Sequence, residues 1–178
     1  MLRVSVVGSS GSGKTTFARA LGAALGVPTI ELDAIFHLPD WGELPDADFV
    51  DAVTERTSSR GWVVDGNYSA VRPLVWARAD TVVFLDYSRA RVMSRLVPRT
   101  ARRLVTREEL WTGCREPWSN VLSVDPRRSI LAWSWTRHAV YRCRFASAAA
   151  DPRWAHLRFA RPRSPRDAAD LLAGIRSG

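Results

Sequence analysis

The sequence predicts an α/β fold, in which one domain is built from a parallel β-sheet with helices on both faces. Short, continuous apolar runs, typical of strands buried on both faces, alternate along the chain with segments of helical periodicity. A glycine-rich turn separates the first apolar run from the first helical segment. The 178 residues, of which 46% are hydrophobic and 25% charged, suit a single domain with a sizeable core. We therefore expect one domain over residues 1–178.

The expected elements follow one another in the order βαβαβαβα(α)βα. The expected strands are residues 2–7, 29–32, 62–64, 81–85 and 156–160. The expected helices are residues 15–25, a helix capped by Asp46, and residues 88–103, 129–145 and 167–175. The first helix repeats Phe17, Leu21 and Leu25 at four-residue spacing, and Gly26 is its expected stop. Ser88 is the expected cap of the third helix.

The charge of the chain is unevenly distributed. The formal net charge is +8 and the sequence pI is near 10.8, but residues 87–166 alone carry a net charge of +13 and residues 1–86 a net charge of −4. Arginine accounts for all but one of the 26 basic residues, and the single lysine is Lys14. The excess of arginine over lysine reflects either a compositional preference of the source organism or an anionic partner. Lysine at one position alone indicates a site that requires a compact ammonium group.

Several classes of protein are not expected. The longest mostly apolar stretch, residues 129–141, is interrupted by Arg137 and His138 and is shorter than the ~18 residues that a membrane span needs. The N-terminus has no apolar segment followed by a small-residue cleavage site, so it does not resemble a secretory signal. Cys114 and Cys143 lack the spacing of a disulfide framework or a zinc site. We expect a cytoplasmic protein with structural cysteines and no membrane contact.

A phosphate-binding loop of the Walker A type follows the first expected strand. Residues 8–15 match the pattern G-x-x-x-x-G-K-[ST] between a strand and a helix. Its glycines let backbone N–H groups point at phosphate oxygens, next to the positive end of the helix dipole. Lys14 is expected to neutralise the β- and γ-phosphates of ATP, and the Thr15 hydroxyl to ligate Mg²⁺. The alternative is a turn without a ligand. The residues expected to bind the nucleotide here are Gly8, Ser9, Ser10, Gly11, Ser12, Gly13, Lys14, Thr15 and Thr16.

Three carboxylates follow expected strands, at the edge of the sheet where ligands of parallel sheets bind. Asp65 is the predicted Mg²⁺ ligand, directly or through water, because the glycine after it lets the backbone turn away. Asp86 is the alternative metal ligand, although its position before a helix favours capping. Asp33 is predicted to orient or deprotonate an acceptor hydroxyl, or else to cap a turn. His37 and Trp41 are weaker candidates for lining the acceptor pocket.

Four segments together resemble one known family. They are residues 8–16, 30–33, 61–68 and 106–118. They resemble the adenylate-kinase-like P-loop proteins labelled DNA topology modulation proteins (FlaR-like). The resemblance implies a P-loop NTPase three-layer sandwich of nucleoside-monophosphate-kinase type, with a five-stranded parallel sheet of order 2-3-1-4-5 and an arginine-rich lid, expected at residues 97–128. Adenylate kinases carry Phe-Pro-Arg where this chain has Asn67, Tyr68 and Ser69, so true adenylate kinase activity is not expected.

The arginine-rich segment holds candidate phosphate ligands. Arg91, Arg95, Arg99 and Arg102 recur at spacings of three and four, so they share one face of the expected helix. Such a face is either solvated or directed at a transferring phosphoryl group, whose charge it would stabilise. The predicted phosphate ligands are Arg99, Arg102 and Arg103, with Arg107 and Arg115 as weaker candidates. The residues predicted at the edge of the adenine are Arg161 and Arg163, between the last strand and the last helix.

Two functions compete. The first is an ATP- and Mg²⁺-dependent small-molecule phosphotransferase of nucleotide-kinase-like type. The alternative is a nucleic-acid-associated regulatory P-loop ATPase, in which the basic segment and its tryptophans bind phosphates and stack on bases. An arginine-rich lid explains the same charge, so nucleic acid is the less favoured partner. A nucleotide-binding protein without catalysis is a third reading, and the sequence identifies neither the acceptor nor the oligomeric state.

Overall fold

The sheet at the centre of the protein is five-stranded and all-parallel, with strand order β2-β3-β1-β4-β5. The computed structural model describes residues 1–110, 113–115, 117–118, 121 and 123–176. The strands are β1 (Arg3–Gly8), β2 (Thr29–Glu31), β3 (Trp62–Asp65), β4 (Thr81–Leu85) and β5 (Arg158–Ala160). The expected α/β class, the parallel sheet and its strand order are confirmed.

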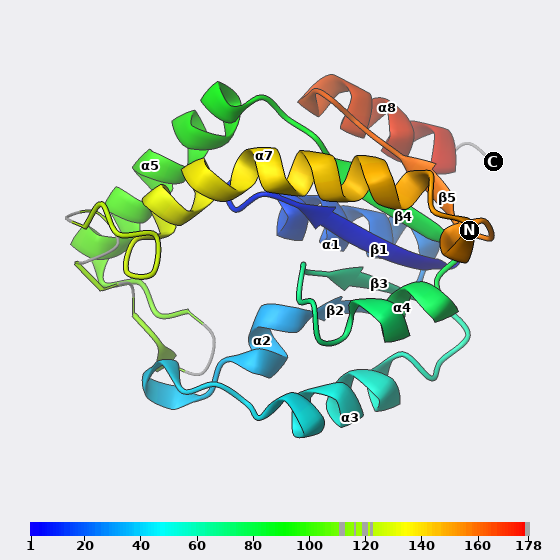
Figure 1. Ribbon diagram of the computed structural model, residues 1–178, viewed down its shortest axis with the longest axis horizontal. Coiled ribbons are helices and arrows are strands. Elements are labelled where there is room, and N and C mark those ends of the chain that lie inside the picture. Colours follow the sequence, from blue (N-terminus) through cyan, green and yellow to red (C-terminus); the bar gives the residue numbers. More distant parts are fainter. Residues whose placement is uncertain (111–112, 116, 119–120, 122, 177–178) are drawn as a thin grey trace.

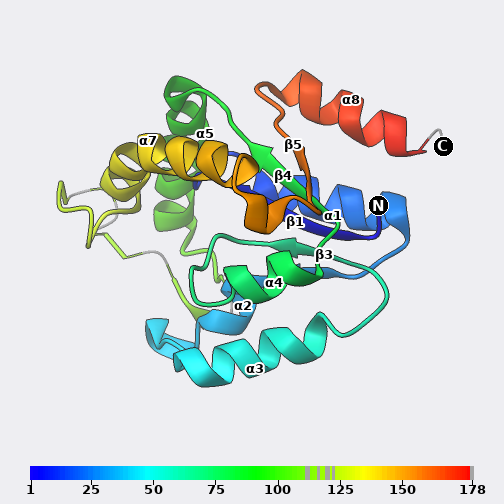
Figure 2. The same ribbon diagram turned by 45° about the vertical axis from the view of Figure 1, so that its right-hand side comes forward.

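Helices cover both faces of this sheet and complete a three-layer sandwich. They are α1 (Lys14–Leu25), α2 (Leu32–Phe36), α3 (Asp46–Arg56), α4 (Arg72–Arg78), α5 (Arg89–Thr106), α7 (Ile130–Ala149) and α8 (Pro165–Arg176), with the short 3₁₀ turns η1 (Pro39–Trp41) and η3 (Pro152–Trp154). In Figure 1, α7 crosses in front of the sheet and α1 lies behind it. In Figure 2, α8 lies on one side of the sheet, and α3 and α4 lie on the other.

Neighbouring residues within a strand supply two separate hydrophobic cores. Val6 of β1 belongs to the core that includes Phe17 of α1, whereas Val7 belongs to the core that includes Trp76 of α4 and Phe145 of α7. All five side chains are buried. Because successive side chains of a strand point to opposite faces, a strand covered on both sides must be apolar throughout. This explains why the strands are visible in the sequence as continuous apolar runs.

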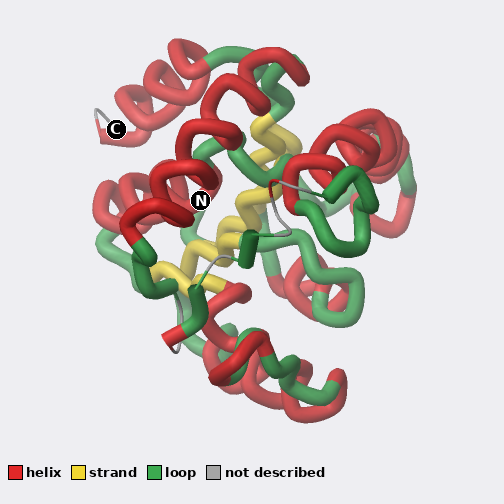
Figure 3. The backbone as a smooth tube through the Cα atoms, turned by 90° about the vertical axis from the view of Figure 1, so that its left-hand side faces the viewer, coloured by secondary structure: helices red, strands yellow, loops and turns green. Residues whose placement is uncertain are grey.

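The register of the strands brings their carboxyl ends to one edge of the sheet. Val6 of β1 pairs with Asp65 of β3, and Asp65 also pairs with Glu31, the last residue of β2. On the other side of β1, Gly8 pairs with Leu85 at the end of β4. The loops after these strands therefore start side by side. Figure 3 views the molecule from this side.

Some elements begin or end differently from the expectation. The strand β2 ends at Glu31 because α2 starts at Leu32, so Asp33 lies in the first turn of a helix. The expected order placed a helix between the third and fourth strands without assigning residues to it, and this helix is α4, whereas the short helix α2 was not expected. The helix α5 continues through Pro98 to Thr106, so the beginning of the segment 97–128 is helical. Its buried positions, Val92, Leu96, Thr100 and Leu104, recur every four residues and carry the packed face past the proline.

No helix within the described part of the chain is long and apolar enough to cross a membrane.

Candidate active site

The phosphate loop connects β1 to α1, and the helix begins at Lys14. Gly11 and Gly13 both have a φ of +86°, a left-handed conformation that other residues adopt only with strain. Gly11 also packs against α5, where an added Cβ would meet the Val92 carbonyl oxygen at 2.8 Å. The Lys14 ammonium donates a hydrogen bond to the Ser9 carbonyl at 3.1 Å and so folds back onto the loop.

The charges of two carboxylates and one arginine act on this ammonium group. Burial lowers the pKa of Lys14, the negative charges of Asp65 and Asp33 oppose the lowering, and the positive charge of Arg99 adds to it. The structure therefore brings together four residues that were predicted separately. They come from α1, α2, β3 and α5, and Asp65, Asp33 and Arg99 all lie within electrostatic range of Lys14.

Thr15 and Asp65, the two residues predicted to hold Mg²⁺, contact each other. The Thr15 hydroxyl donates to Asp65 Oδ2 at 2.6 Å. The other carboxylate oxygen, Oδ1, is buried and has no hydrogen-bond partner among the described residues. Burial raises the pKa of Asp65, while Lys14 and the hydrogen bond from Thr15 lower it. An unpaired buried carboxylate oxygen beside a hydroxyl fits Mg²⁺, which is held by few side chains together with water and substrate phosphates.

The described residues contain no group of three or more His, Cys, Asp or Glu side chains placed to hold a metal ion. Zinc and calcium sites usually take three or more such ligands from the protein. The Thr15 and Asp65 pair therefore suits Mg²⁺ bound together with a nucleotide better than it suits a metal caged by the protein alone.

Asp33 has a partner that the sequence analysis did not single out. The Tyr68 hydroxyl donates to Asp33 Oδ1 at 2.7 Å, and His37 Nε2 lies 3.5 Å from the same hydroxyl. The ring of Tyr68 packs against Phe36 and Phe49, with centroid distances of 4.7 and 5.1 Å. Burial raises the pKa of Tyr68, and the charge and hydrogen bond of Asp33 raise it further, so Tyr68 remains a donor that fixes one carboxylate oxygen.

Asn67 joins the loop after β3 to the phosphate loop and was also missed. Its Oδ1 accepts from the Gly8 backbone N–H at 3.1 Å, and its Nδ2 donates to the Gly8 carbonyl. Burial raises the pKa of Tyr141 on α7, and the nearby Asn67 amide opposes the rise. The available signal was the pair Asn67 and Tyr68, two polar side chains directly after a strand that ends in Asp-Gly.

The arginines of α5 divide into two groups. Arg95, on the face singled out from the sequence, donates from Nη1 to the Ser12 carbonyl at 3.4 Å. Arg99 lies within electrostatic range of Lys14. In contrast, Arg102 pairs with Glu108 at 2.9 Å, and Arg103 lies 3.9 Å from the same carboxylate.

The weaker arginine candidates lie beyond α5. Arg107 is the left-handed C-cap of that helix. Arg115 pairs with Glu109 at 2.6 Å, with both side chains exposed. Neither arginine contacts the phosphate loop through a described ion pair or hydrogen bond.

Asp86 takes part in an ion-pair cluster instead of capping a helix. Its buried carboxylate lies 2.9 Å from Arg142 of α7 and 2.7 Å from Arg161 after β5. The cap of α5 is Ser88, whose side chain accepts from the Arg91 N–H. The carboxylate is therefore already neutralised by two guanidinium groups, which favours Asp65 as the metal ligand.

Of the two residues predicted at the adenine, Arg161 is held by this ion pair. The backbone N–H of Arg163 donates to Asp167 at 2.8 Å, at the start of α8. Both residues follow β5, whose end lies at the same edge of the sheet as the phosphate loop.

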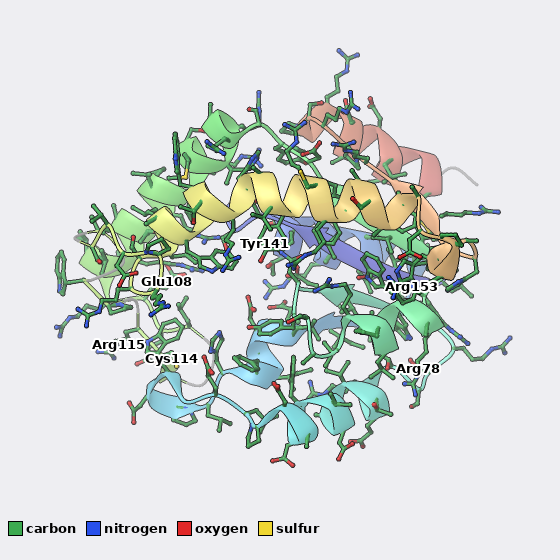
Figure 4. The ribbon with its side chains drawn as sticks, in the orientation of Figure 1. Arg78, Glu108, Cys114, Arg115, Tyr141 and Arg153 are labelled. Atoms are coloured by element: carbon green, nitrogen blue, oxygen red, sulfur yellow. The ribbon has the colours of Figure 1, made fainter. Side chains whose placement is uncertain are left out.

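The turn after α2 contacts the segment after α5. The Trp41 indole donates to the Arg115 carbonyl at 2.8 Å, and the buried thiol of Cys114 donates to the Leu38 carbonyl at 3.3 Å. Figure 4 shows Cys114 and Arg115 beside this turn. Trp41, predicted to line an acceptor pocket, thus binds the expected lid, while its ring lies 5.3 Å from that of His37.

The fold and the phosphate loop together define a P-loop protein with the fold of small-molecule kinases. No protein-family model matches the chain, and no curated protein matches it in sequence. Solved structures match it in fold. A gluconokinase from Sinorhizobium meliloti 1021 is 24% identical over 98% of this chain and 93% of that chain, with a TM-score of 0.50.

Two shikimate kinases are also similar in structure. The enzyme from Acinetobacter baumannii, solved in complex with shikimate, is 18% identical, with a TM-score of 0.60 over 98% of this chain and 90% of that chain. The enzyme from Bacteroides thetaiotaomicron is 14% identical, with a TM-score of 0.55 over 99% of this chain and 97% of that chain. At these identities the likeness shows the fold, which is that of P-loop kinases.

Proposed function

We propose that the protein is an ATP- and Mg²⁺-dependent phosphotransferase that acts on a small-molecule acceptor. One observation carries the proposal. The Thr15 and Asp65 pair, with its unpartnered carboxylate oxygen, lies beside Lys14, and the charge of Asp33 acts on the same ammonium group. A metal ligand, a phosphate ligand and a candidate base thus converge on one phosphate loop, as phosphoryl transfer requires.

Each residue has a distinct part in the proposed reaction. Lys14 exchanges the Ser9 carbonyl for the β- and γ-phosphate oxygens, and Thr15 and Asp65 hold Mg²⁺. Mg²⁺ held by these two residues would supply charge neutralisation at the same phosphate oxygens. Asp33, oriented by Tyr68, accepts the proton of the acceptor hydroxyl as its oxygen bonds to the γ-phosphorus. The bond from that phosphorus to the bridging oxygen breaks, and ADP leaves.

The basic residues supply charge around this reaction in the proposal. Arg99, and Arg95 beside it, approach the phosphate loop from α5 and would stabilise the transferring group. Arg102 and Arg103 would join them if the segment 97–128 moves as a lid, which requires the pairs with Glu108 to open. Arg161 and Arg163 would edge the adenine. The resemblance to DNA topology modulation proteins is the most specific family assignment within this proposal.

ADP release in the presence of Mg·ATP and pools of acceptors tests the proposal. The pools are nucleoside monophosphates, nucleosides, sugars and hydroxy acids, with gluconate and shikimate added because fold neighbours are named for them. We expect ADP formation that depends on one pool and is lost in Lys14→Ala. Lys14→Arg is the matched control, because it keeps the charge but not the compact ammonium group. Turnover retained in Lys14→Ala would disprove the site assignment.

A regulatory ATPase that binds nucleic acid is the second candidate function. Arg89 lies over the ring of Trp135 at 4.8 Å, and Trp135 and Trp118 are both more than half exposed. Exposed tryptophans among arginines suit base stacking and phosphate contacts. Slow ADP formation that is indifferent to every acceptor, but raised by nucleic acid in a salt-sensitive way, would favour this function over the first.

A further inference from the structure

A groove of about 420 Å³ lies between α4 and the second half of α7, away from the phosphate loop. Its lining includes Arg72, Trp76, Arg144, Ser147 and Trp154. Arg153, labelled in Figure 4, marks the end nearest η3. A volume of this size is typical of sites for small organic ligands.

The groove is separate from the phosphate loop along α7. Ser134 of this helix donates to the Ser10 carbonyl of the loop at 3.1 Å. Arg144 follows Ser134 by almost three helical turns, which is a rise of about 15 Å at 1.5 Å per residue. A ligand held by Arg144 is therefore distinct from phosphates held at residues 8–15.

Two arginines in the groove have no carboxylate to pair with. Among the residues that the structure describes, neither Arg72 nor Arg144 forms an ion pair. The one acidic residue in the lining, Asp151, is neutralised by Arg153 at 2.6 Å. Burial lowers the pKa of Arg72, and the nearby charge of Arg144 lowers it further, so the two guanidinium groups repel each other across the groove. An anion between them would remove this repulsion.

The rest of the lining is aromatic, apolar or hydroxylic. The half-buried ring of Trp154 stands edge-on to Trp76, with a centroid distance of 5.3 Å and an interplanar angle of 82°. Trp76 is almost fully buried, and its indole N–H donates to the Ser5 hydroxyl at 3.2 Å, so it presents only carbon to the groove. Ser69 and Ser147 add exposed hydroxyl groups at the rim.

We propose that this groove binds a small organic anion in which a phosphate or carboxylate group is attached to a planar ring. Arg72 and Arg144 hold the anionic group with charge-assisted hydrogen bonds, as guanidinium groups hold carboxylates and phosphates. The ring packs against Trp154 and the apolar floor. The site lies beyond the residues that the proposed phosphoryl transfer uses, so it does not depend on that proposal.

Calorimetric titration with phenyl phosphate and with benzoate tests the site. We expect one of these probes, or both, to bind at one site per chain. Arg72→Gln and Arg144→Gln should each raise the Kd of the binding probe about tenfold or more, through the loss of a charge-assisted hydrogen bond. Arg166→Gln, on the exposed side of α8, and Lys14→Ala, in the phosphate loop, should leave the Kd unchanged. Inorganic phosphate should bind about tenfold more weakly than phenyl phosphate, because it has no ring.

Four results would overturn the proposal. They are the absence of saturable binding of either probe, an unchanged Kd in Arg144→Gln, loss of binding in Lys14→Ala, and equal affinity for inorganic phosphate and phenyl phosphate. Arg144 is exposed, so its replacement keeps the fold even where that of the half-buried Arg72 does not. In NMR spectra, the indole N–H signal of Trp154, assigned with Trp154→Phe, should shift during the titration.

Discussion

The side-chain amide of Asn67 hydrogen-bonds both the N–H and the C=O of Gly8, the first residue of the phosphate loop. Asn67 lies just after β3. The last backbone hydrogen bond between β1 and β3 runs from the Gly66 N–H to the Val6 carbonyl. The Asn67 side chain takes the place of one further pair of strand hydrogen bonds. The start of the phosphate loop is thus fixed by a side chain from the neighbouring strand.

We expect Asn67→Ala to destabilise the protein by about 1–3 kcal/mol and to weaken nucleotide binding, because both polar groups of Gly8 lose their partner. Thermal unfolding and calorimetric titration with ATP measure the two effects. Asn67→Asp keeps an acceptor for the Gly8 N–H but places a carboxylate against the Gly8 carbonyl, so it should not restore the wild-type affinity. Wild-type stability and affinity in Asn67→Ala would show that this contact is incidental.

Asp33 and Tyr68 should differ in their effect on turnover. We expect Asp33→Asn to lower kcat by about 10²- to 10⁴-fold, the usual contribution of a general base. Tyr68→Phe keeps the packing of the ring on Phe36 and Phe49 and removes only the hydroxyl that orients Asp33. Its kcat should fall less than that of Asp33→Asn, with KM for ATP unchanged. Steady-state kinetics of both variants compare the two losses of kcat. A larger loss of kcat in Tyr68→Phe than in Asp33→Asn would contradict the role given to Asp33.

Gly11 is the position where the phosphate loop tolerates a side chain least. A Cβ there would require a left-handed alanine and would meet the Val92 carbonyl and Leu96 Cβ at 2.8 and 2.9 Å. We expect Gly11→Ala to cost about 2–4 kcal/mol of the free energy of unfolding. Gly26→Ala is the matched control, because Gly26 is also left-handed but has no atom within 4 Å of an added Cβ. Urea denaturation should show a cost of about 1–2 kcal/mol there. Equal losses of stability in Gly11→Ala and Gly26→Ala would contradict an energetic cost from the packing of Gly11 on α5.

Asp80 makes stability depend on pH. Partial burial raises the pKa of Asp80, but hydrogen bonds from the Leu2 and Arg3 backbone N–H groups and from Thr81 outweigh it, so the pKa is lowered. A lowered pKa means that the ionised form is favoured in the folded state. Its contribution is present above the unfolded-state pKa of about 3.9 and is lost as the pH falls through the lower folded-state pKa.

We therefore expect Asp80→Ala to lower the free energy of unfolding by about 1 kcal/mol at pH 7 and by almost nothing near pH 2. Solvent screening reduces the value at pH 7. Urea denaturation of wild type and variant at both pH values gives the comparison. Asp170→Ala, which removes an exposed carboxylate of α8, controls for the change in net charge. A difference between wild type and Asp80→Ala that stays constant with pH would contradict the assignment.

The parts of the structure that the sequence predicted are those with a local pattern. The strands are continuous apolar runs because helices cover both faces, and the phosphate loop has its glycines and lysine within eight residues. Asp65 could be placed beside Thr15 because both follow strands that end at the same edge. Strand order came from the family resemblance, since periodicity alone does not order parallel strands.

The remaining features depend on contacts between distant parts of the chain. Asp86 meets Arg142 and Arg161, and no local pattern distinguishes such a carboxylate from a helix cap. Similarly, the spacing of the α5 arginines defined a shared face, but only the position of α5 over the loop decides that Arg95 contacts it while Arg102 reaches Glu108. The role of Asn67 rests on a contact 59 residues away in the sequence.

Lys14 is the one lysine of the chain, and its Nζ folds onto the Ser9 carbonyl. Apart from the N-terminal amine, every amine-directed reaction of this protein therefore falls on a single atom at the centre of the phosphate loop. Acylation there removes the positive charge at the centre of the loop in one event, whereas most proteins spread such modifications over many surface lysines. A peptide map that separates acylation of Lys14 from acylation of the N-terminus therefore counts the chains whose loop was open to the reagent.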